Sequence, residues 1–342
     1  MICLFFNISF NLVKKKMNQP KAVISESEVL DFSDIYIHLK EPETKSYMFF
    51  KRIRQTVDVN ADSAPHIKKM ADIIKKKHEE TKQLSFRVAY LKRLYRVTMI
   101  KSVDGTMAEC RAQPRQLIPL NKLGLPPQVK NWTLNERLCK GGLILVVGAV
   151  GSGKTTTCAA IAKARVELFG GVLLTIEDPA ELPMHGRIGN GLCVQYEIET
   201  KEDFLEAGRL ALRCYPADKA GIMFIGEIRD SKSASLALRA SLDGRLVVAT
   251  MHGDSVISAL QRLISYTTEE MSINEAYSLL QNGFRLCLHQ EWDAGQLKVQ
   301  FLADTQTAAK TIKQQKIDLL GSELYAQQTK LINNEPIKLR EI

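Results

Sequence analysis

The chain has 342 residues, enough for two domains that each close a hydrophobic core. Its 45% apolar and 25% charged residues are typical of a soluble globular protein. The 47 Lys and Arg exceed the 38 Asp and Glu, but no run of like charge is longer than "KKK", which excludes a basic tail.

The net charge of +9 leaves two interpretations open. The excess of basic residues reflects either an ordinary basic surface or a surface that attracts an anionic partner, such as nucleic acid or a layer of lipid headgroups. The seven cysteines are scattered and form no CxxC pair, so neither a zinc knuckle nor a dithiol redox site is indicated. Unpaired thiols of this kind fit a reducing cytosol.

The first 16 residues are apolar and then basic, "MICLFFNISFNLV" followed by "KKK". A secretory signal has the reverse order, and a stretch of thirteen residues is too short to span a bilayer. We favour Met17 as the true start, with residues 1–16 as upstream or non-native sequence. A short membrane-contacting segment is the alternative.

Residues 30–118 predict a small α+β domain. Short alternating stretches such as "DIYIHLK" and "SFRVAYL" indicate strands, and "MIKSVDGTMAE" indicates a hairpin because Asp-Gly suits a tight turn. Between them, "SAPHIKKMADIIKKKHEE" has apolar residues at helical spacing, with Ser63 or Asp62 as a possible cap. The Pro- and Gly-rich "IPLNKLGLPPQV" indicates a linker, so residues 17–128 form the first domain and linker.

Residues 129–342 predict an α/β domain with a helical C-terminal tail. Apolar runs at 143–147, 172–176, 222–225 and 246–249 alternate with helical stretches at 154–169, 231–242 and 255–265. Short, continuously apolar strands between amphipathic helices imply a parallel sheet covered on both faces.

A phosphate-binding loop lies between the first of these strands and its helix. "GAVGSGKT" matches G-x-x-x-x-G-K-[ST], in which glycines let backbone N–H groups surround a phosphate chain at a helix N-terminus. Lys154 can reach the β- and γ-phosphates, and the Thr155 hydroxyl can bind Mg²⁺. A simple glycine turn is the structural alternative. The predicted ATP-binding residues are Gly148, Gly151, Ser152, Gly153, Lys154, Thr155 and Thr156.

Three further motifs follow strands of the same sheet. "IMFIGEIRD" places Glu227 where a P-loop protein holds its metal, "TIEDPAELPMH" gathers three carboxylates, and "VVATMHGD" places His252 at a strand end. Taken singly, each has a structural alternative: a capped strand end, a solvated acidic loop and a structural histidine. Their common position at the carboxyl edge of an open sheet favours a ligand site.

The order and spacing of "GAVGSGKTT", "TIEDPAE", "GEIRD" and "ATMHGD" resemble the P-loop, Asp box, Walker B and His box of the secretion ATPases of type II secretion, type IV pili and type IV secretion, most of all the PilT branch and its DotB-like relatives. The resemblance covers residues of about 33 to 290. It implies a RecA-like P-loop ATPase domain (α/β), a smaller N-terminal PAS-like α+β domain, and a ring homohexamer that uses ATP and Mg²⁺.

The resemblance also implies roles for single residues. Glu181 matches the residue assigned as the base on water, Glu227 the Walker B glutamate that, with Thr155, lies near Mg²⁺, and His252 the γ-phosphate sensor. Arg87 in "FRV" and Arg111 in "CRAQP" match arginines that neutralise transition-state charge. A surface salt bridge is the alternative for each arginine. Departures from the family include Arg245 in "DGRLVV", "QYE" at 195–197 and a longer hairpin at 96–111.

The resemblance implies a motor of a type IV pilus system. We place retraction first. Extension ATPases usually carry an extra N-terminal domain and a tetracysteine zinc site, and we recognise neither in this sequence. Secretion or pilus assembly is the alternative. The expected place is the cytoplasm, peripheral to the inner membrane through a polytopic platform protein. A nucleic-acid translocase and an inactive structural ring belong to other classes; we expect no nucleic-acid partner, because no stacking platform is evident.

Overall fold

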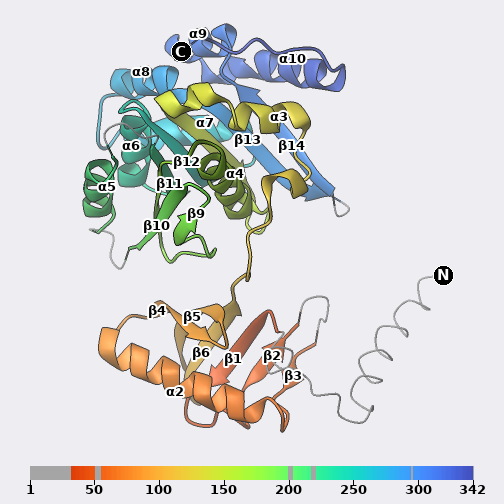
Figure 1. The fold of residues 1–342 in the computed structure, drawn as a ribbon, viewed down its shortest axis with the longest axis vertical. Coiled ribbons are helices and arrows are strands. Elements are labelled where there is room, and N and C mark those ends of the chain that lie inside the picture. The colour runs from red at the N-terminus through yellow and green to blue at the C-terminus, as the bar shows by residue number, and fades with distance from the viewer. Residues whose placement is uncertain (1–31, 51–54, 199–202, 217–220, 294–295, 342) are drawn as a thin grey trace, which may run out of the picture. The chain divides into compact units, whose positions relative to one another are not determined.

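The computed structural model describes residues 32–50, 55–198, 203–216, 221–293 and 296–341 (Figure 1). Contacts divide the chain into two units, one ending at Gln113 and the other beginning at Pro114. The prediction that Met17 is the true start lies outside the described residues.

The first unit is an antiparallel sheet with one long helix. The sheet has the order β3-β2-β1-β6-β5-β4. The predicted hairpin is confirmed, since β5 and β6 pair with Ser102 opposite Gly105. The elements are β1 (Asp34–His38), β2 (Tyr47–Phe49), β3 (Val57–Asp58), α2 (Ala64–Thr81), β4 (Ser85–Tyr90), β5 (Arg93–Ser102) and β6 (Gly105–Ala112).

Helix α2 covers one face of this sheet. Its buried residues Ile67, Met70 and Ile74 pack with alternate residues of the strands, such as Ile35 and Val97. This alternation follows from the period of two in a strand, which leaves the intervening side chains on the opposite face.

Ser63 is the residue that precedes helix α2, as predicted, but its side chain makes no capping bond to the helix. Its hydroxyl instead accepts from the backbone N–H of Asn60.

The second unit is built on an eight-stranded sheet of order β14-β13-β7-β12-β11-β8-β10-β9. Strands from β13 to β10 run parallel, and β14 and β9 pair antiparallel at the two edges. The strands are β7 (Gly142–Gly148), β8 (Val172–Glu177), β9 (Gly186–Ile188), β10 (Gly191–Glu197), β11 (Gly221–Ile228), β12 (Arg245–His252), β13 (Phe284–Asp293) and β14 (Gln296–Ala303).

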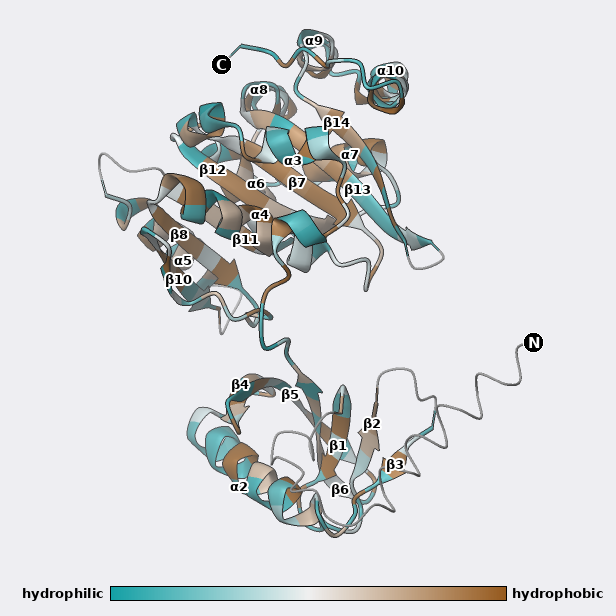
Figure 2. Cartoon of the chain, turned by 45° about the vertical axis from the view of Figure 1, so that its right-hand side comes forward, coloured by the Kyte–Doolittle hydropathy of each residue, from teal (hydrophilic) through white to brown (hydrophobic). Residues whose placement is uncertain are grey.

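Helices cover both faces of this sheet, as the continuous apolar strands predicted. Strand β7 is buried throughout: Leu145 packs into the core beneath α6, α7 and α8, and Ile144 into the core beneath α3 and α4. Figure 2 shows these central strands as markedly hydrophobic. The helices are α3 (Pro127–Thr133), α4 (Lys154–Phe169), α5 (Asp203–Arg213), α6 (Ser231–Ala240), α7 (Val256–Thr267), α8 (Ile273–Gly283), α9 (Gln306–Lys313) and α10 (Leu320–Ile332), with short 3-10 helices η1 (Leu120–Lys122), η2 (Glu136–Lys140) and η3 (Ile317–Leu319).

The segment expected to be a linker packs with the second unit. Leu120 and Leu125 are buried in the core beneath α4. By these contacts, residues 114–128 lie with the second unit, whereas the sequence grouped them with the first domain.

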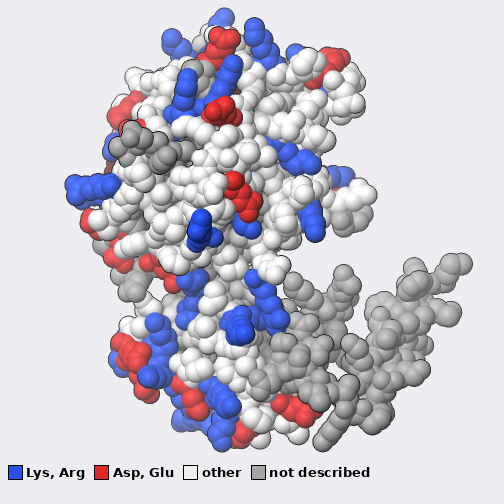
Figure 3. Space-filling model, viewed as in Figure 1, with Lys and Arg blue, Asp and Glu red and all other residues white. Residues whose placement is uncertain are grey.

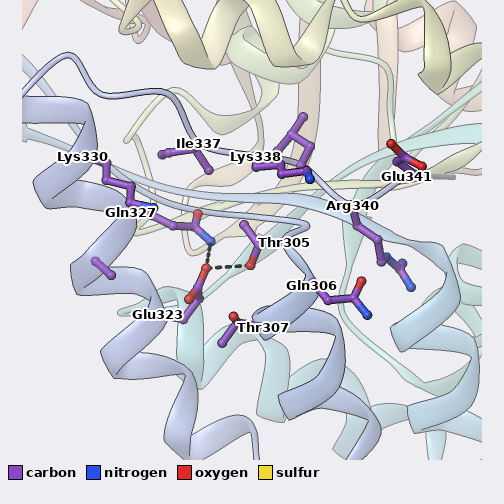
Figure 4. A pocket seen from close by; sticks show the side chains of 12 residues that line it. Thr305, Gln306, Thr307, Glu323, Gln327, Lys330, Ile337, Lys338, Arg340 and Glu341 are labelled. Carbon is purple, nitrogen blue, oxygen red and sulfur yellow. Dashed lines mark hydrogen bonds between the residues drawn. The ribbon is translucent and has the colours of Figure 1, made fainter.

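The C-terminal segment folds back on α9 and α10 and lines one side of a half-open cavity of about 530 Å³ (Figure 4). In this cavity Glu323 accepts hydrogen bonds from Thr305 and Gln327. Nearby, Arg340 bonds the buried carboxylate of Asp304, which Arg285 also contacts. The cavity contains none of the predicted nucleotide-binding residues.

Charged side chains of both signs are interspersed over the face drawn in Figure 3. Among the described residues, every helix is too short or too polar to span a lipid bilayer.

Candidate active site

The glycine-rich loop joins β7 to α4 as the sequence predicted. Gly148, Gly151 and Gly153 all have positive φ (151°, 77° and 87°), which residues with a side chain rarely adopt. At Gly148 a Cβ atom would also lie 2.3 Å from the carbonyl oxygen of Gln290. All three positions therefore favour glycine for conformation, and Gly148 requires it for space as well.

Helix α4 begins at this loop without a side-chain cap. Its N-cap residue is Gly153, whereas α6, α7 and α8 are capped by Asp230, Ser255 and Ser272. The first N–H groups of a helix need acceptors, and an anion can supply them when no side chain does. Thr155 and Thr156 lie half-buried in this first turn.

Lys154 is 8% exposed, and its Nζ donates a hydrogen bond to the Ala149 carbonyl at 2.8 Å. Burial lowers the pKa of Lys154, while the negative charges of Glu227 and Glu181 act in the opposite direction. The ammonium group is positioned inside the loop, where it can turn toward a phosphate.

The ends of β11 and β12 bring Glu227 and His252 together. His252 Nε2 lies 3.0 Å from Glu227 Oε1, and His252 is the register partner of Gly148. A bulge between Ile225 and Ile228 shifts the register of β11 at Glu227. Bulges of this kind commonly re-aim a side chain next to an active site. The predicted neighbourhood of Walker B, His box and P-loop is thus present in the second unit.

The end of β8 carries the acidic cluster, but its carboxylates differ in environment. Glu177 is buried, and burial raises its pKa. Asp178 forms an ion pair with Arg229 at 2.5 Å, and Glu181 is exposed on the following loop. Of the three, Glu177 alone is buried, whereas Asp178 and Glu181 are both exposed to solvent.

Gln195 organises this loop, a role that the sequence did not predict. Its side-chain oxygen accepts from the backbone N–H groups of Met184 and His185, each at 2.9 Å. Its side-chain nitrogen donates to Glu177 and to the Leu182 carbonyl, each also at 2.9 Å. The sequence analysis noted "QYE" because Tyr196 replaces the arginine of the family pattern, and it did not single out Gln195.

Arg87 and Arg111 lie in the first unit. Strand pairing aligns Arg87 with Arg96 and Arg96 with Arg111, so three arginines form a row across β4, β5 and β6. Arg111 donates to Asp34 at 2.7 Å and lies 3.4 Å from Glu109. The salt bridge considered as the alternative for Arg111 is therefore present, and it raises the pKa of Arg111. Arg96 was not singled out from the sequence.

Solved structures share the fold. The pilus retraction motor PilT with bound ADP matches with a TM-score of 0.71 at 23% identity, over 94% of this chain and 95% of that chain. The DotB ATPase of Legionella pneumophila matches with a TM-score of 0.66 at 20% identity, over 91% and 86% of the two chains. The second unit therefore has the RecA-like P-loop fold that the sequence predicted.

Sequence comparison points to secretion proteins. The type II secretion system protein HxcR of Pseudomonas aeruginosa is 32% identical over 259 residues, which are 72% of this chain and 53% of HxcR. The chain spans about half the length of the curated relatives it matches. The model of the type II/IV secretion system protein family matches residues 15–322, and the chain belongs to this family.

Proposed function

We propose that this protein is an ATP-hydrolysing motor whose catalytic centre lies at the carboxyl edge of the second unit. The observation that carries the proposal is the pairing of Glu227 with His252 at 3.0 Å, in register with the first glycine of an uncapped phosphate-binding loop. An ordinary glycine turn gives no reason for a histidine–carboxylate pair at that place.

The residues of this edge suit ATP with Mg²⁺. The loop glycines and the first turn of α4 offer N–H donors to the phosphates, and Lys154 adds a positive charge. Magnesium prefers oxygen ligands, which Thr155 and Glu227 can provide, and when bound it would neutralise charge on the phosphates. His252 holds the Glu227 carboxylate in place, and Glu181 can accept a proton from the attacking water.

The test is replacement of Lys154 by glutamine. Lys154→Gln removes the loop's charge, so we expect ATP turnover to fall to background in a phosphate-release assay. Lys163→Gln is the matched control, because Lys163 lies in the same helix but forms an ion pair at the surface with Glu167. Unchanged turnover in Lys154→Gln would contradict the proposal.

We further propose that the motor drives retraction of a type IV pilus. The fold shared with the PilT structure supports retraction. The 32% sequence identity to HxcR supports type II secretion, which we keep as the second candidate. Deleting the gene and counting surface pili separates the two. Excess fibres indicate retraction, loss of all fibres indicates assembly, and unchanged fibres indicate secretion.

We also propose a homohexamer that works in the cytoplasm at the inner membrane, attached through a membrane platform protein. The support is membership of a secretion-system family. Sedimentation of the purified protein with and without ATP and magnesium measures the assembly. A particle that stays monomeric under both conditions would contradict the ring.

A further inference from the structure

Strand β13 extends beyond the end of the strand it pairs with. Its parallel pairing with β7 ends at His289 opposite Val147, yet β13 continues to Asp293, paired there with β14. The extension therefore lies beside the phosphate-binding loop that follows β7. No motif of the sequence analysis includes this part of the chain.

Gln290 contacts both ends of that loop. Its backbone oxygen lies against Gly148, where a Cβ atom would approach it to 2.3 Å. Its side-chain Nε2 donates a hydrogen bond of 2.6 Å to the carbonyl of Ser152, which is 138 positions earlier in the chain. Gln290 is only 1% exposed. Its Oε1 has no hydrogen-bond partner among the described residues, so the Nε2 bond to Ser152 is the contact that fixes this buried amide.

The bond to Ser152 fixes the orientation of one peptide group. The peptide between Ser152 and Gly153 is trans, so the Ser152 carbonyl and the Gly153 N–H point in opposite directions. Because Gln290 holds the carbonyl, the Gly153 N–H points away from Gln290. If this peptide were rotated by half a turn, the Ser152 carbonyl oxygen would point to the side that the Gly153 N–H now faces. The loop would then present an acceptor to a phosphate in place of a donor.

Gly153 itself does not fix the orientation of this peptide, because glycine populates both signs of φ. Some other group must therefore select one orientation of the peptide. In the described part of the chain, the Gln290 amide is placed to do so.

We propose that Gln290 is a positioning residue for nucleotide binding, which holds the Ser152–Gly153 peptide with its N–H available to a phosphate. The proposal rests on the proposed ATP-binding function and goes beyond the family motifs. It assigns part of the site to the β13–β14 hairpin.

The test compares Gln290→Met and Gln290→Glu with the unaltered full-length protein. Methionine keeps the length of the side chain and removes the donor, while glutamate keeps the shape and faces the carbonyl with an acceptor. The loop donors bind phosphate in the ground state and the transition state alike, so their loss raises KM and leaves kcat unchanged. We expect KM for ATP, and Kd for a fluorescent ATP analogue, to rise about tenfold in Gln290→Met, as for one buried hydrogen bond, and further in Gln290→Glu.

The control is Gln300→Met, since Gln300 lies in the same hairpin opposite His289 and has no bond to the loop among the contacts described. It should bind ATP as the unaltered protein does. A role in folding alone would lower kcat through a smaller active fraction and leave KM unchanged, and that result overturns the proposal. Wild-type KM and Kd in the folded Gln290→Glu protein overturn it also.

The two proposals fail differently. If the unaltered protein binds ATP and Lys154→Gln does not, while both Gln290 variants bind normally, the positioning role is wrong and the ATPase function stands. If the unaltered protein does not bind ATP, the proposed function itself is wrong.

Discussion

At the scale of single residues, the sequence could reveal the residues of the candidate site that belong to a local motif. The positions of Gly148, Gly153 and Lys154 follow from spacing within eight residues. Gln195 and Gln290 hold the same site together, but their partners lie in other elements. Glutamine is common and its bonds depend on which strands become neighbours, so no spacing rule could have found them.

Glu177 allows a prediction about pH. Burial raises its pKa above the ordinary value of 4.5, so in the interval between these two values the folded protein binds more protons than the unfolded chain. The free energy of unfolding contributed by this group therefore falls as pH rises through that interval. Glu177→Gln cannot titrate and keeps an oxygen for the bond from Gln195.

The measurement is urea denaturation of both proteins at several pH values from 4.5 upward. We expect the difference in unfolding free energy, variant minus unaltered protein, to rise with pH and then level off. A difference that stays flat across the range would show that burial does not control this carboxyl group.

At the scale of elements, the buried centre of the second unit was predictable and its edges were not. The expected helix at 154–169 is α4, Lys154–Phe169, and the four expected apolar runs are β7, β8, β11 and β12. Strands buried on both faces are continuously apolar, which gives a strong signal. Strand β14 lies at the edge and β13 next to it, and both mix polar with apolar residues, as in "LHQEWD", so their pattern is ambiguous.

The C-terminal segment provides a prediction at this scale. Arg340 attaches it to the second unit through two hydrogen bonds to the Asp304 carboxylate and one to the Gln281 carbonyl. Arg340→Ala removes these bonds and leaves Asp304 with Arg285 alone. Breaking a buried ion pair outright costs about 3–5 kcal/mol, so with one partner remaining we expect a loss of about 2 kcal/mol.

Chemical denaturation measures this loss. Lys338→Ala is the control, because Lys338 is exposed in the same segment, and it should change stability by less than about 0.5 kcal/mol. Equal effects of the two substitutions would mean that the Asp304 contact does not hold the segment.

At the scale of the whole molecule, the positive charge belongs mainly to the first unit. Residues 32–113 contain 17 Lys and Arg against 10 Asp and Glu, whereas residues 114–342 contain 26 against 25. Most of the net positive charge of the chain therefore lies in the first unit. The composition of the whole chain could not show this. Both interpretations left open by the sequence, an ordinary basic surface and attraction to an anionic partner, therefore concern mainly the first unit.

The arginine row of the first unit makes this attraction testable. The resemblance to the family implies, and we propose, that Arg87 and Arg111 neutralise transition-state charge on the phosphates of ATP, whereas binding of the nucleotide rests on the loop at Lys154. We expect Arg87→Ala and Arg111→Ala each to lower kcat about a hundredfold, as for loss of one group that stabilises transition-state charge. Kd for ATP should change far less, because the P-loop contacts remain.

Stopped-flow binding and steady-state hydrolysis, measured on the same full-length preparations, separate the two effects. Lys101→Ala is the matched control: it removes a charge from β5 of the same unit at an exposed position outside the row. If all three substitutions slow turnover equally, the net charge of the unit matters rather than the two arginines. If neither arginine affects kcat, the Asp34–Arg111 ion pair is structural, and charge for the transition state comes from the second unit alone.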